Sequence, residues 1–225
     1  MKKSILIVSL VLLVDQASKF WIKTNMTIGQ EFHVLGNWFI IHFTENEGMA
    51  FGLSFGGEFG KLALSLFRIL AIIVIAIYLF RLIKQNAHGG LIASMSLILA
   101  GAIGNIIDSA FYGLIFSSSS YHSVASLFPE GGGYGTFLHG KVVDMLYFPI
   151  IQGHYPDWFP LWGGKDFIFF RPVFNIADSA ITIGVFILIF FQKKFFGKPV
   201  TSGKEVADEQ DQTEEDTGEK ENPSL

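Results

Sequence analysis

The stretch FNIADSAI, residues 174–181, opens the last long apolar run of the chain, Val173 to Phe191. We interpret this run as a membrane-spanning segment, with Pro172 suited to its start because a helix needs no N–H at that position. The run contains a carboxylate, Asp178, although a charge at the centre of a membrane helix costs at least about 2.5–3.5 kcal/mol. Asn175, three residues earlier, would share a helix face with it. An acid in this position is a candidate for function.

The composition is that of a polytopic membrane protein rather than a soluble domain. Half of the 225 residues are hydrophobic, 15% are aromatic, and the mean hydropathy is +0.44. The chain has no cysteine, which excludes disulfides, a thiol nucleophile and thiolate metal ligands. Residues 198–225 contain nine acids and three lysines, whereas residues 1–197 contain 11 acids and 13 Lys or Arg. The net charge of −4 therefore comes from the last 28 residues. Nothing in this distribution indicates a surface that binds nucleic acid.

Four apolar segments predict the fold class: an α-helical membrane protein with four transmembrane helices and a small extramembrane β-sheet, or cradle, on the outer face. The segments cover about residues 4–24, 61–83, 91–107 and 173–191. The first also resembles a signal peptide, but no small-residue cleavage site follows it. We expect residues 1–196 to form one membrane domain and residues 197–225 to form a disordered, acidic cytoplasmic tail.

Two segments between the apolar runs, 25–60 and 109–171, are expected on the outer face. The β-branched and aromatic residues at 33–44 predict a strand, and the Trp and Pro residues at 154–162 are typical of an interfacial segment. Basic residues gather at the opposite ends of the four runs: Lys2, Lys3, Arg81, Lys84, Lys193, Lys194 and Lys198. By the positive-inside tendency those ends face the cytoplasm, so both termini lie inside and the acids of the runs lie toward the outer surface.

Two acids in apolar contexts form the candidate catalytic pair. Asp144 lies in a short apolar run, and the connection from it to Asp178 is long enough for the two side chains to meet. Two neighbouring carboxyl groups share one proton. The ionised member can then activate a water molecule while the protonated member donates to a peptide carbonyl. Asp108, Asp157 and Asp166 compete as partners, although Asp157 and Asp166 are more typical of solvated loops.

Other chemistries find weaker support in the sequence. Residues 52–56, GLSFG, match the Gly-x-Ser-x-Gly nucleophile pattern, but the α/β context that this motif requires is missing. No His-Glu-x-x-His occurs and the six histidines are scattered, so no metal site is predicted. Asp15 and Lys19 fall on one helix face, acid first. This pair is either an ion relay or, more commonly, a buried couple that orients the first helix.

Five short elements occur in the order found in a known family: DQASK (15–19), NEGMAF (46–51), GNIID (104–108), VVDM (142–145) and FNIADSAI (174–181). With these elements the chain resembles bacterial lipoprotein signal peptidase, signal peptidase II, over residues 4–194. The resemblance implies an aspartic endopeptidase of the bacterial inner membrane, with its active site toward the periplasm. Such an enzyme removes signal peptides from prolipoproteins, cutting before a cysteine already modified with diacylglycerol.

The resemblance also implies roles for individual residues. Its fourth and fifth elements make Asp144 and Asp178 the catalytic dyad. Substrate binding or support of the site is implied for Asp15, Lys19, Asn46, Gly48, Asn105, Asp108, Asn175 and Ala177. No cofactor or metal ion is implied. The expected partners are lipidated prolipoproteins and membrane lipids, and we expect a monomer that binds no nucleic acid.

Two functions from other classes stay open at this point. A small proton-coupled transporter or channel could use the buried acids as a relay. Transporters tend to have internal repeats and sites near the membrane midplane, however, and we find no repeat and acids crowded toward one face. A non-catalytic assembly factor with a polar bundle core is the third possibility. Replacing Asp144 or Asp178 by Asn distinguishes the three, because the variants would lose cleavage, change ion flux or do neither.

One position departs from the family pattern. The family usually has Arg after the acid of its third element, where this chain has Ser109. Arg171, just outside the expected fourth helix, is our candidate for the substitute cation. We therefore expect Arg171→Ala to lower peptidase activity while leaving the thermal unfolding temperature unchanged. Turnover at the wild-type rate by this variant would remove Arg171 from consideration.

Overall fold

Four long helices form the main body of the protein. The computed structural model describes residues 1–47, 57–169 and 172–196, so the expected tail lies outside the described residues. Within the described part, the four helices long and apolar enough to cross a membrane are α1 (Lys2–Asn25), α2 (Gly57–Lys84), α3 (Gly89–Ile107, with its continuation) and α5 (Ile176–Phe196). The continuation of α3 is a π-helical turn, η2 (Asp108–Tyr112), and the short α4 (Gly113–Ile115).

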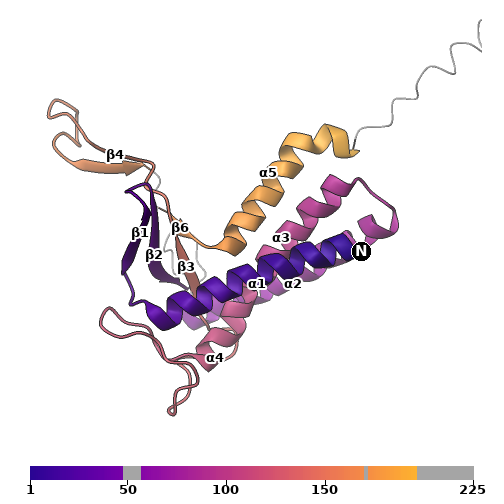
Figure 1. Cartoon of the computed structure of the whole chain (residues 1–225), viewed down its shortest axis with the longest axis horizontal. Helices are drawn as coiled ribbons and strands as arrows, with labels where there is room; N and C mark the ends of the chain where they lie inside the picture. Colours follow the sequence, from indigo (N-terminus) through magenta and orange to yellow (C-terminus); the bar gives the residue numbers. More distant parts are fainter. Residues whose placement is uncertain (48–56, 170–171, 197–225) are drawn as a thin grey trace, which may run out of the picture.

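The helix α3 is central, because it packs against α1, α2 and α5 (Figure 1). Glycines allow the close approach of α3 and α5. A Cβ atom on Gly101 would lie 2.2 Å from the carbonyl oxygen of Ala177, and one on Gly184 would lie 2.8 Å from that of Ser94. Small residues at helix contacts are typical of membrane bundles. Here they bring the first half of α5 into close contact with α3.

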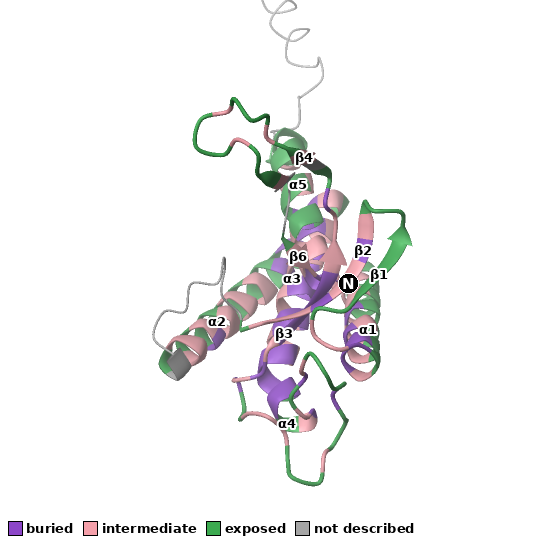
Figure 2. Ribbon diagram, turned by 90° about the vertical axis from the view of Figure 1, so that its left-hand side faces the viewer, coloured by how far each residue is buried: buried purple, intermediate pink, exposed green. Residues whose placement is uncertain are grey.

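A four-stranded antiparallel sheet covers one end of the bundle. Its strands are β1 (Glu31–Leu35), β2 (Phe39–Asn46), β3 (Val142–Tyr147) and β6 (Val173–Phe174), in the order β1-β2-β3-β6. The predicted strand at 33–44 is therefore a hairpin, with Gly36 in its turn at a φ of 53°. The sheet and the four helices confirm the predicted fold class. Figure 2 shows that buried residues concentrate in β3 and in the helical segment beneath it.

A second hairpin extends from this sheet where the sequence indicated only an interfacial loop. It consists of β4 (Ile151–His154) and β5 (Asp166–Phe169), which pair antiparallel from Ile151↔Phe169 to His154↔Asp166. Figure 1 shows that it reaches sideways from the sheet instead of continuing the direction of the helices. Its strands are short, and its turn is rich in Pro, Gly and aromatic residues.

The expected bounds of two spans need correction. The fourth helix begins at Ile176 rather than at 173, because residues 173–174 pair with β3 as β6. Pro172 therefore precedes a strand and does not start the helix. Asp178 lies in the first turn of α5, not two turns in, and Asn175 lies just before the helix instead of sharing its face. The third span also continues to Ile115, which shortens the outer segment expected at 109–171.

A buried cluster beneath the sheet joins α1, the strands and the segment after α4. Its fully buried members come from all of these elements: Ile22, Met26, Phe43, Tyr112, Phe116, Ala125, Val143 and Met145. Because the cluster includes Phe116 and Ala125 of the long connection between α4 and β3, that connection is anchored to the body of the protein at these two residues.

An ion pair in this region attaches the connection between α4 and β3 to α1 and β2. The Lys23 ammonium bonds to the Glu45 carboxylate and donates to Ser119 Oγ at 2.9 Å, while Ser119 Oγ donates to Glu45 Oε1 at 2.8 Å. The ammonium also lies 5.4 Å from the ring centroid of Phe116 and 5.0 Å from that of Tyr134. The Lys23 and Glu45 side chains are 0% and 4% exposed, so α1, β2 and the connection meet at a desolvated charge pair.

Removing one member of this pair should destabilise the protein. We expect Lys23→Met to lower the free energy of unfolding by about 3 kcal/mol, because the buried Glu45 carboxylate would keep only the more distant Lys141 ammonium, at 3.7 Å, as its cationic partner. Thermal unfolding in detergent measures this loss. The double variant Lys23→Met/Glu45→Leu is the matched control and should recover much of it. Equal stability of the single variant and the wild type would contradict this account of the pair.

Candidate active site

The position of Asp178 follows from a reciprocal cap at the start of α5. Asn175 Oδ1 accepts a hydrogen bond from the Asp178 backbone N–H at 2.8 Å, and Asp178 Oδ2 accepts from the Asn175 N–H at 3.4 Å. This arrangement resembles a capping box, in which the two residues satisfy each other's free donors. A carboxylate there also faces the positive end of the helix dipole. The cap places Asp178, half-buried, at the end of the bundle that the sheet covers.

Asp144 reaches the same place from the sheet. It is 4% exposed in β3, and its Oδ1 accepts a hydrogen bond from Asn175 Nδ2 at 2.7 Å. The side chain of Asn46, at the end of β2, also bonds to this carboxylate. Burial, followed by the charge of Asp178, raises the pKa of Asp144 to about 7, against the opposing effect of the two amides. The structure thus brings Asp144 and Asp178 together, with one side chain, Asn175, in contact with both residues.

Asn105 completes the contact between the two acids. Its Nδ2 donates to Asp178 Oδ1 at 2.8 Å, and its Oδ1 accepts from Asn175 Nδ2 at 3.1 Å. The same Oδ1 accepts from the Lys19 ammonium at 3.1 Å. Asn105 therefore joins the two acids to a buried lysine on α1.

Lys19 is the centre of a fully buried ionic group beneath the dyad. Its Nζ lies 2.9 Å from Asp15 Oδ2 and 2.8 Å from Asp108 Oδ2, and all three side chains are 0% exposed. Each acid also holds a backbone group: Asp15 Oδ1 accepts from the Ala177 N–H at 2.9 Å, and Asp108 Oδ2 accepts from the Val143 N–H at 3.2 Å. The predicted Asp15–Lys19 pair is confirmed. Asp15 positions the helix that carries Asp178, and Asp108 positions the strand that carries Asp144.

Gln16 is a member of this group that the sequence analysis missed. Its Nε2 lies 2.9 Å from Asp108 Oδ1 and 3.1 Å from Asp15 Oδ2, and its Oε1 accepts from Tyr112 OH at 3.2 Å. In the sequence, the indication of this role was an amide side chain next to Asp15 in an otherwise apolar segment. Gly104 matters here as well, because a Cβ at that position would lie 2.8 Å from Asp15 Oδ2.

A second cation approaches the dyad from α2. The Arg68 guanidinium is half-buried, and the carboxylates of Asp178, Asp144 and Asp108 all attract it, in decreasing order. One turn earlier, Ser65 Oγ donates to the carbonyl of Leu138 at 3.1 Å, which holds α2 against the connection beside η2. Arg171 was the candidate from the sequence for the cation that replaces the family Arg absent at Ser109, and it lies outside the described residues. Arg68 supplies positive charge at this site in the described part of the chain.

Two of the remaining acids lie away from the site. Asp157 and Asp166 lie on the β4–β5 hairpin, where Asp166 is 89% exposed and bonds to His154 at 2.8 Å. They are therefore not partners of Asp178. Gly48 and the GLSFG stretch lie outside the described residues. Among the residues that the structure does describe, no group of three or more His, Asp or Glu side chains could hold a metal ion.

An apolar groove of about 350 Å³ lies between α1 and the sheet. Its lining comes from α1, β2, β3 and the first residue of α5: Ser18, Trp21, Ile22, Ile41, Met145, Leu146 and Ile176. Neither Asp144 nor Asp178 is among these lining residues, although Met145 and Ile176 are close to them in the sequence. The groove is therefore an apolar surface formed by the same elements that carry the two acids.

The chain is similar in sequence to a known family over most of its length. A sequence model described as Signal peptidase (SPase) II matches residues 7–193. The lipoprotein signal peptidase of Porphyromonas gingivalis is 53% identical over 184 residues, which cover 81% of this chain and 79% of the relative. That of Amoebophilus asiaticus is 39% identical over 194 residues, covering 85% and 78%.

Solved structures agree with these sequence matches. One bacterial membrane enzyme, determined by the in meso method at 2.3 Å resolution, has a TM-score of 0.59 and 27% identity, covering 91% of this chain and 96% of its own. A second, at 1.9 Å, has a TM-score of 0.55 and 28% identity, covering 85% and 93%. The fold and the sequence therefore point to one family.

The raised pKa of Asp144 predicts how stability changes with pH. The native state keeps a proton on Asp144 up to about pH 7, whereas the unfolded chain releases it near 3.8, so stability falls as pH rises between these values. We expect Asp144→Asn, which carries no such charge, to be more stable than the wild type at pH 8 by on the order of 4 kcal/mol. Thermal unfolding from pH 5 to 8 measures the difference, which should shrink toward pH 5. A difference independent of pH would contradict the prediction.

Proposed function

Because this chain belongs to the signal peptidase II family, it is a membrane peptidase that removes signal peptides from prolipoproteins by an aspartic mechanism, and we propose that Asp144 and Asp178 are its catalytic pair. The observation that carries this proposal is the side chain of Asn175. It accepts from the Asp178 N–H and donates to the Asp144 carboxylate, so the two acids face one site. They come from different elements, a strand and a helix, and the same amide aligns both.

We assign the protonated role to Asp144 and the ionised role to Asp178. Asp144 is the more buried of the two, and its pKa of about 7 keeps a proton available near neutral pH. Asp178 accepts from Asn105 Nδ2 and faces the N-terminus of α5, which both favour negative charge. Asp178 takes a proton from water as the oxygen attacks the peptide carbonyl, and Asp144 donates to the carbonyl oxygen. Collapse of the tetrahedral intermediate then returns a proton to the leaving nitrogen.

The substrate that best suits the groove is a prolipoprotein cut before a diacylglyceryl-modified cysteine. A signal peptide is an apolar helix, and a diacylglyceryl group adds two acyl chains beside the scissile bond. The groove between α1 and the sheet is apolar, and its lining includes residues of β3 and α5, the elements that carry the two acids. Asn46, Asn105, Ala177 and the buried ionic group around Lys19 then serve to bind substrate or to support the dyad.

We propose that the enzyme lies in the bacterial inner membrane as a monomer, with both termini in the cytoplasm. Basic residues at one end of the bundle support this orientation: Lys2, Lys3, Arg81, Lys84, Lys193 and Lys194. The start of α1 and the end of α5 lie at the same end of the bundle (Figure 1). The dyad and the cradle then face the periplasm. Residues 1–196 form the membrane domain in this proposal, and residues 197–225 form a disordered cytoplasmic tail.

Replacing either proposed catalytic acid tests the assignment. We expect Asp144→Asn and Asp178→Asn each to lower kcat/KM by about 10²–10⁴, because each removes proton transfer in the transition state. The assay is cleavage of a diacylglyceryl-modified prolipoprotein peptide by purified enzyme. Asp157→Asn, which changes an acid on the exposed hairpin, is the matched control and should cleave at the wild-type rate. Near-normal cleavage by either dyad variant, with its fold intact, would refute the pair.

A further inference from the structure

The tip of the β4–β5 hairpin is a folded unit, although it lies far from the bundle. Its backbone is closed by hydrogen bonds from Tyr155 N–H to the Lys165 carbonyl (2.9 Å) and from Gly163 N–H to the Phe159 carbonyl (2.9 Å). Beneath them the Tyr155 ring packs on Phe159 at 5.1 Å and on Phe167 at 4.8 Å between centroids. This aromatic stack gives the tip one defined shape.

That shape presents large apolar side chains outward. Trp158 is 78% exposed, Leu161 is 85% exposed and Trp162 is 51% exposed. Leu161 has a φ of 69°, a left-handed conformation that is costly for a residue with a branched side chain. A strained backbone that directs an apolar side chain into solvent is unusual unless something receives that side chain.

The charges of the hairpin indicate that the surface in contact with its apolar tip is itself apolar and uncharged. Its charged residues are Asp157, Lys165 and Asp166, a net of −1, and Asp166 is already bonded to His154. A surface that attracted nucleic acid or anionic headgroups would instead be basic. Trp with flanking apolar residues and little charge is the composition found at the boundary between lipid and water.

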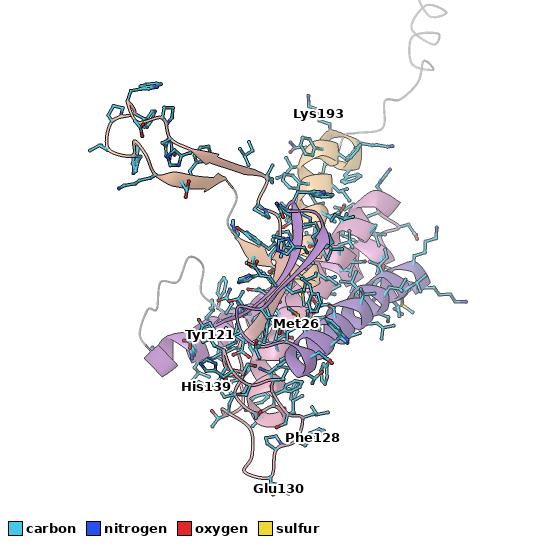
Figure 3. The ribbon with its side chains drawn as sticks, turned by 60° about the vertical axis from the view of Figure 1, so that its left-hand side comes forward. Met26, Tyr121, Phe128, Glu130, His139 and Lys193 are labelled. Atoms are coloured by element: carbon cyan, nitrogen blue, oxygen red, sulfur yellow. The ribbon has the colours of Figure 1, made fainter. Side chains whose placement is uncertain are left out.

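The base of the hairpin lies at that boundary. Phe148, which precedes β4, stacks on Phe39 of β2 at 4.8 Å and on Phe174 of β6 at 5.7 Å. The transmembrane helix α5 begins only two residues after Phe174, so this stack lies where the chain enters the membrane. From there the hairpin reaches sideways in two views (Figures 1 and 3). Its strands, about 13 Å long at four residues each, therefore run beside the bilayer surface rather than away from it.

We propose that the β4–β5 hairpin is a membrane-surface arm whose tip, formed by Trp158, Leu161 and Trp162, inserts into the interfacial layer of the outer leaflet. The arm binds phospholipid through apolar and aromatic contacts, so its insertion does not depend on headgroup charge. It gives the cradle a second attachment to the bilayer beside α5. This proposal goes beyond peptide cleavage and does not depend on the identity of the catalytic acids.

The absence of cysteine from the chain allows a direct test by site-directed spin labelling. The full-length enzyme is placed in phosphatidylcholine vesicles with a single nitroxide at Leu161→Cys. Ile77→Cys, 50% exposed on α2, is the lipid reference, and Glu130→Cys, exposed within the connection between α4 and β3, is the water reference (Figure 3). Collision with oxygen, relative to a water-soluble nickel complex, reports the surroundings of each label.

We expect the oxygen-to-nickel ratio at residue 161 to be severalfold above that at residue 130 and below that at residue 77. Trp158→Ser with Trp162→Ser should lower the ratio at 161, whereas Tyr121→Ser, an exposed aromatic elsewhere, should not. The ratio should be the same with phosphatidylglycerol added to the vesicles.

A label at 161 as accessible to nickel as that at 130 would overturn the proposal. Shelter that appears only after a lipidated precursor is added would also overturn it, and would assign the tip to substrate. Cleavage assays on the same samples test the proposed catalytic function separately, because the collision readout does not require an active dyad.

Discussion

The structure depends on the two short contacts that the Lys19 ammonium makes in the dry interior. Taking three charges out of water costs several kcal/mol for each ion, and only close opposite charges with further hydrogen bonds offset that cost. Asp15 and Asp108 provide the opposite charges, and Gln16 and two backbone N–H groups donate to their oxygens. Asn105 Oδ1 accepts a further hydrogen bond from the Lys19 ammonium. Asp15 holds the start of α5, and Asp108 holds β3. A single lysine between the two acids therefore helps to fix the relative position of two elements that are far apart in the sequence.

The chemistry of the site is a consequence of that support. Asp144 and Asp178 lie in different elements, yet each is adjacent to a backbone N–H that the ionic group holds, at Val143 and at Ala177. Burial raises the proton affinity of the Asp144 carboxyl, whereas Asp178 is half-buried and lies in the first turn of α5. The acids differ in environment rather than in kind, which is how a pair of identical side chains acquires two different roles.

Sequence reasoning located the two acids because charge is rare in apolar segments, and it located Asp15 and Lys19 because helix periodicity places them on one face. It could not separate strand from helix at residues 173–174, where an apolar aromatic run suits both, and tertiary pairing with β3 decided the outcome. It also missed contacts between distant parts of the chain. Lys23 and Glu45 have no periodic relation, and Arg68 looked like any basic residue near a helix start.

The π-helical turn after α3 has a consequence for transplanting parts between relatives. Widening the helix at η2 frees carbonyl oxygens that an α-helix would use internally, and the connection before β3 takes them up: Gly140 N–H donates to the Ser109 carbonyl at 2.8 Å, and Leu138 N–H donates to that of Ala110 at 3.4 Å. The π-helical turn and the connection therefore satisfy each other's backbone hydrogen bonds. A chimera that exchanges the connection alone would leave unsatisfied carbonyls beside Asp108, so the graft must carry both the turn and the connection.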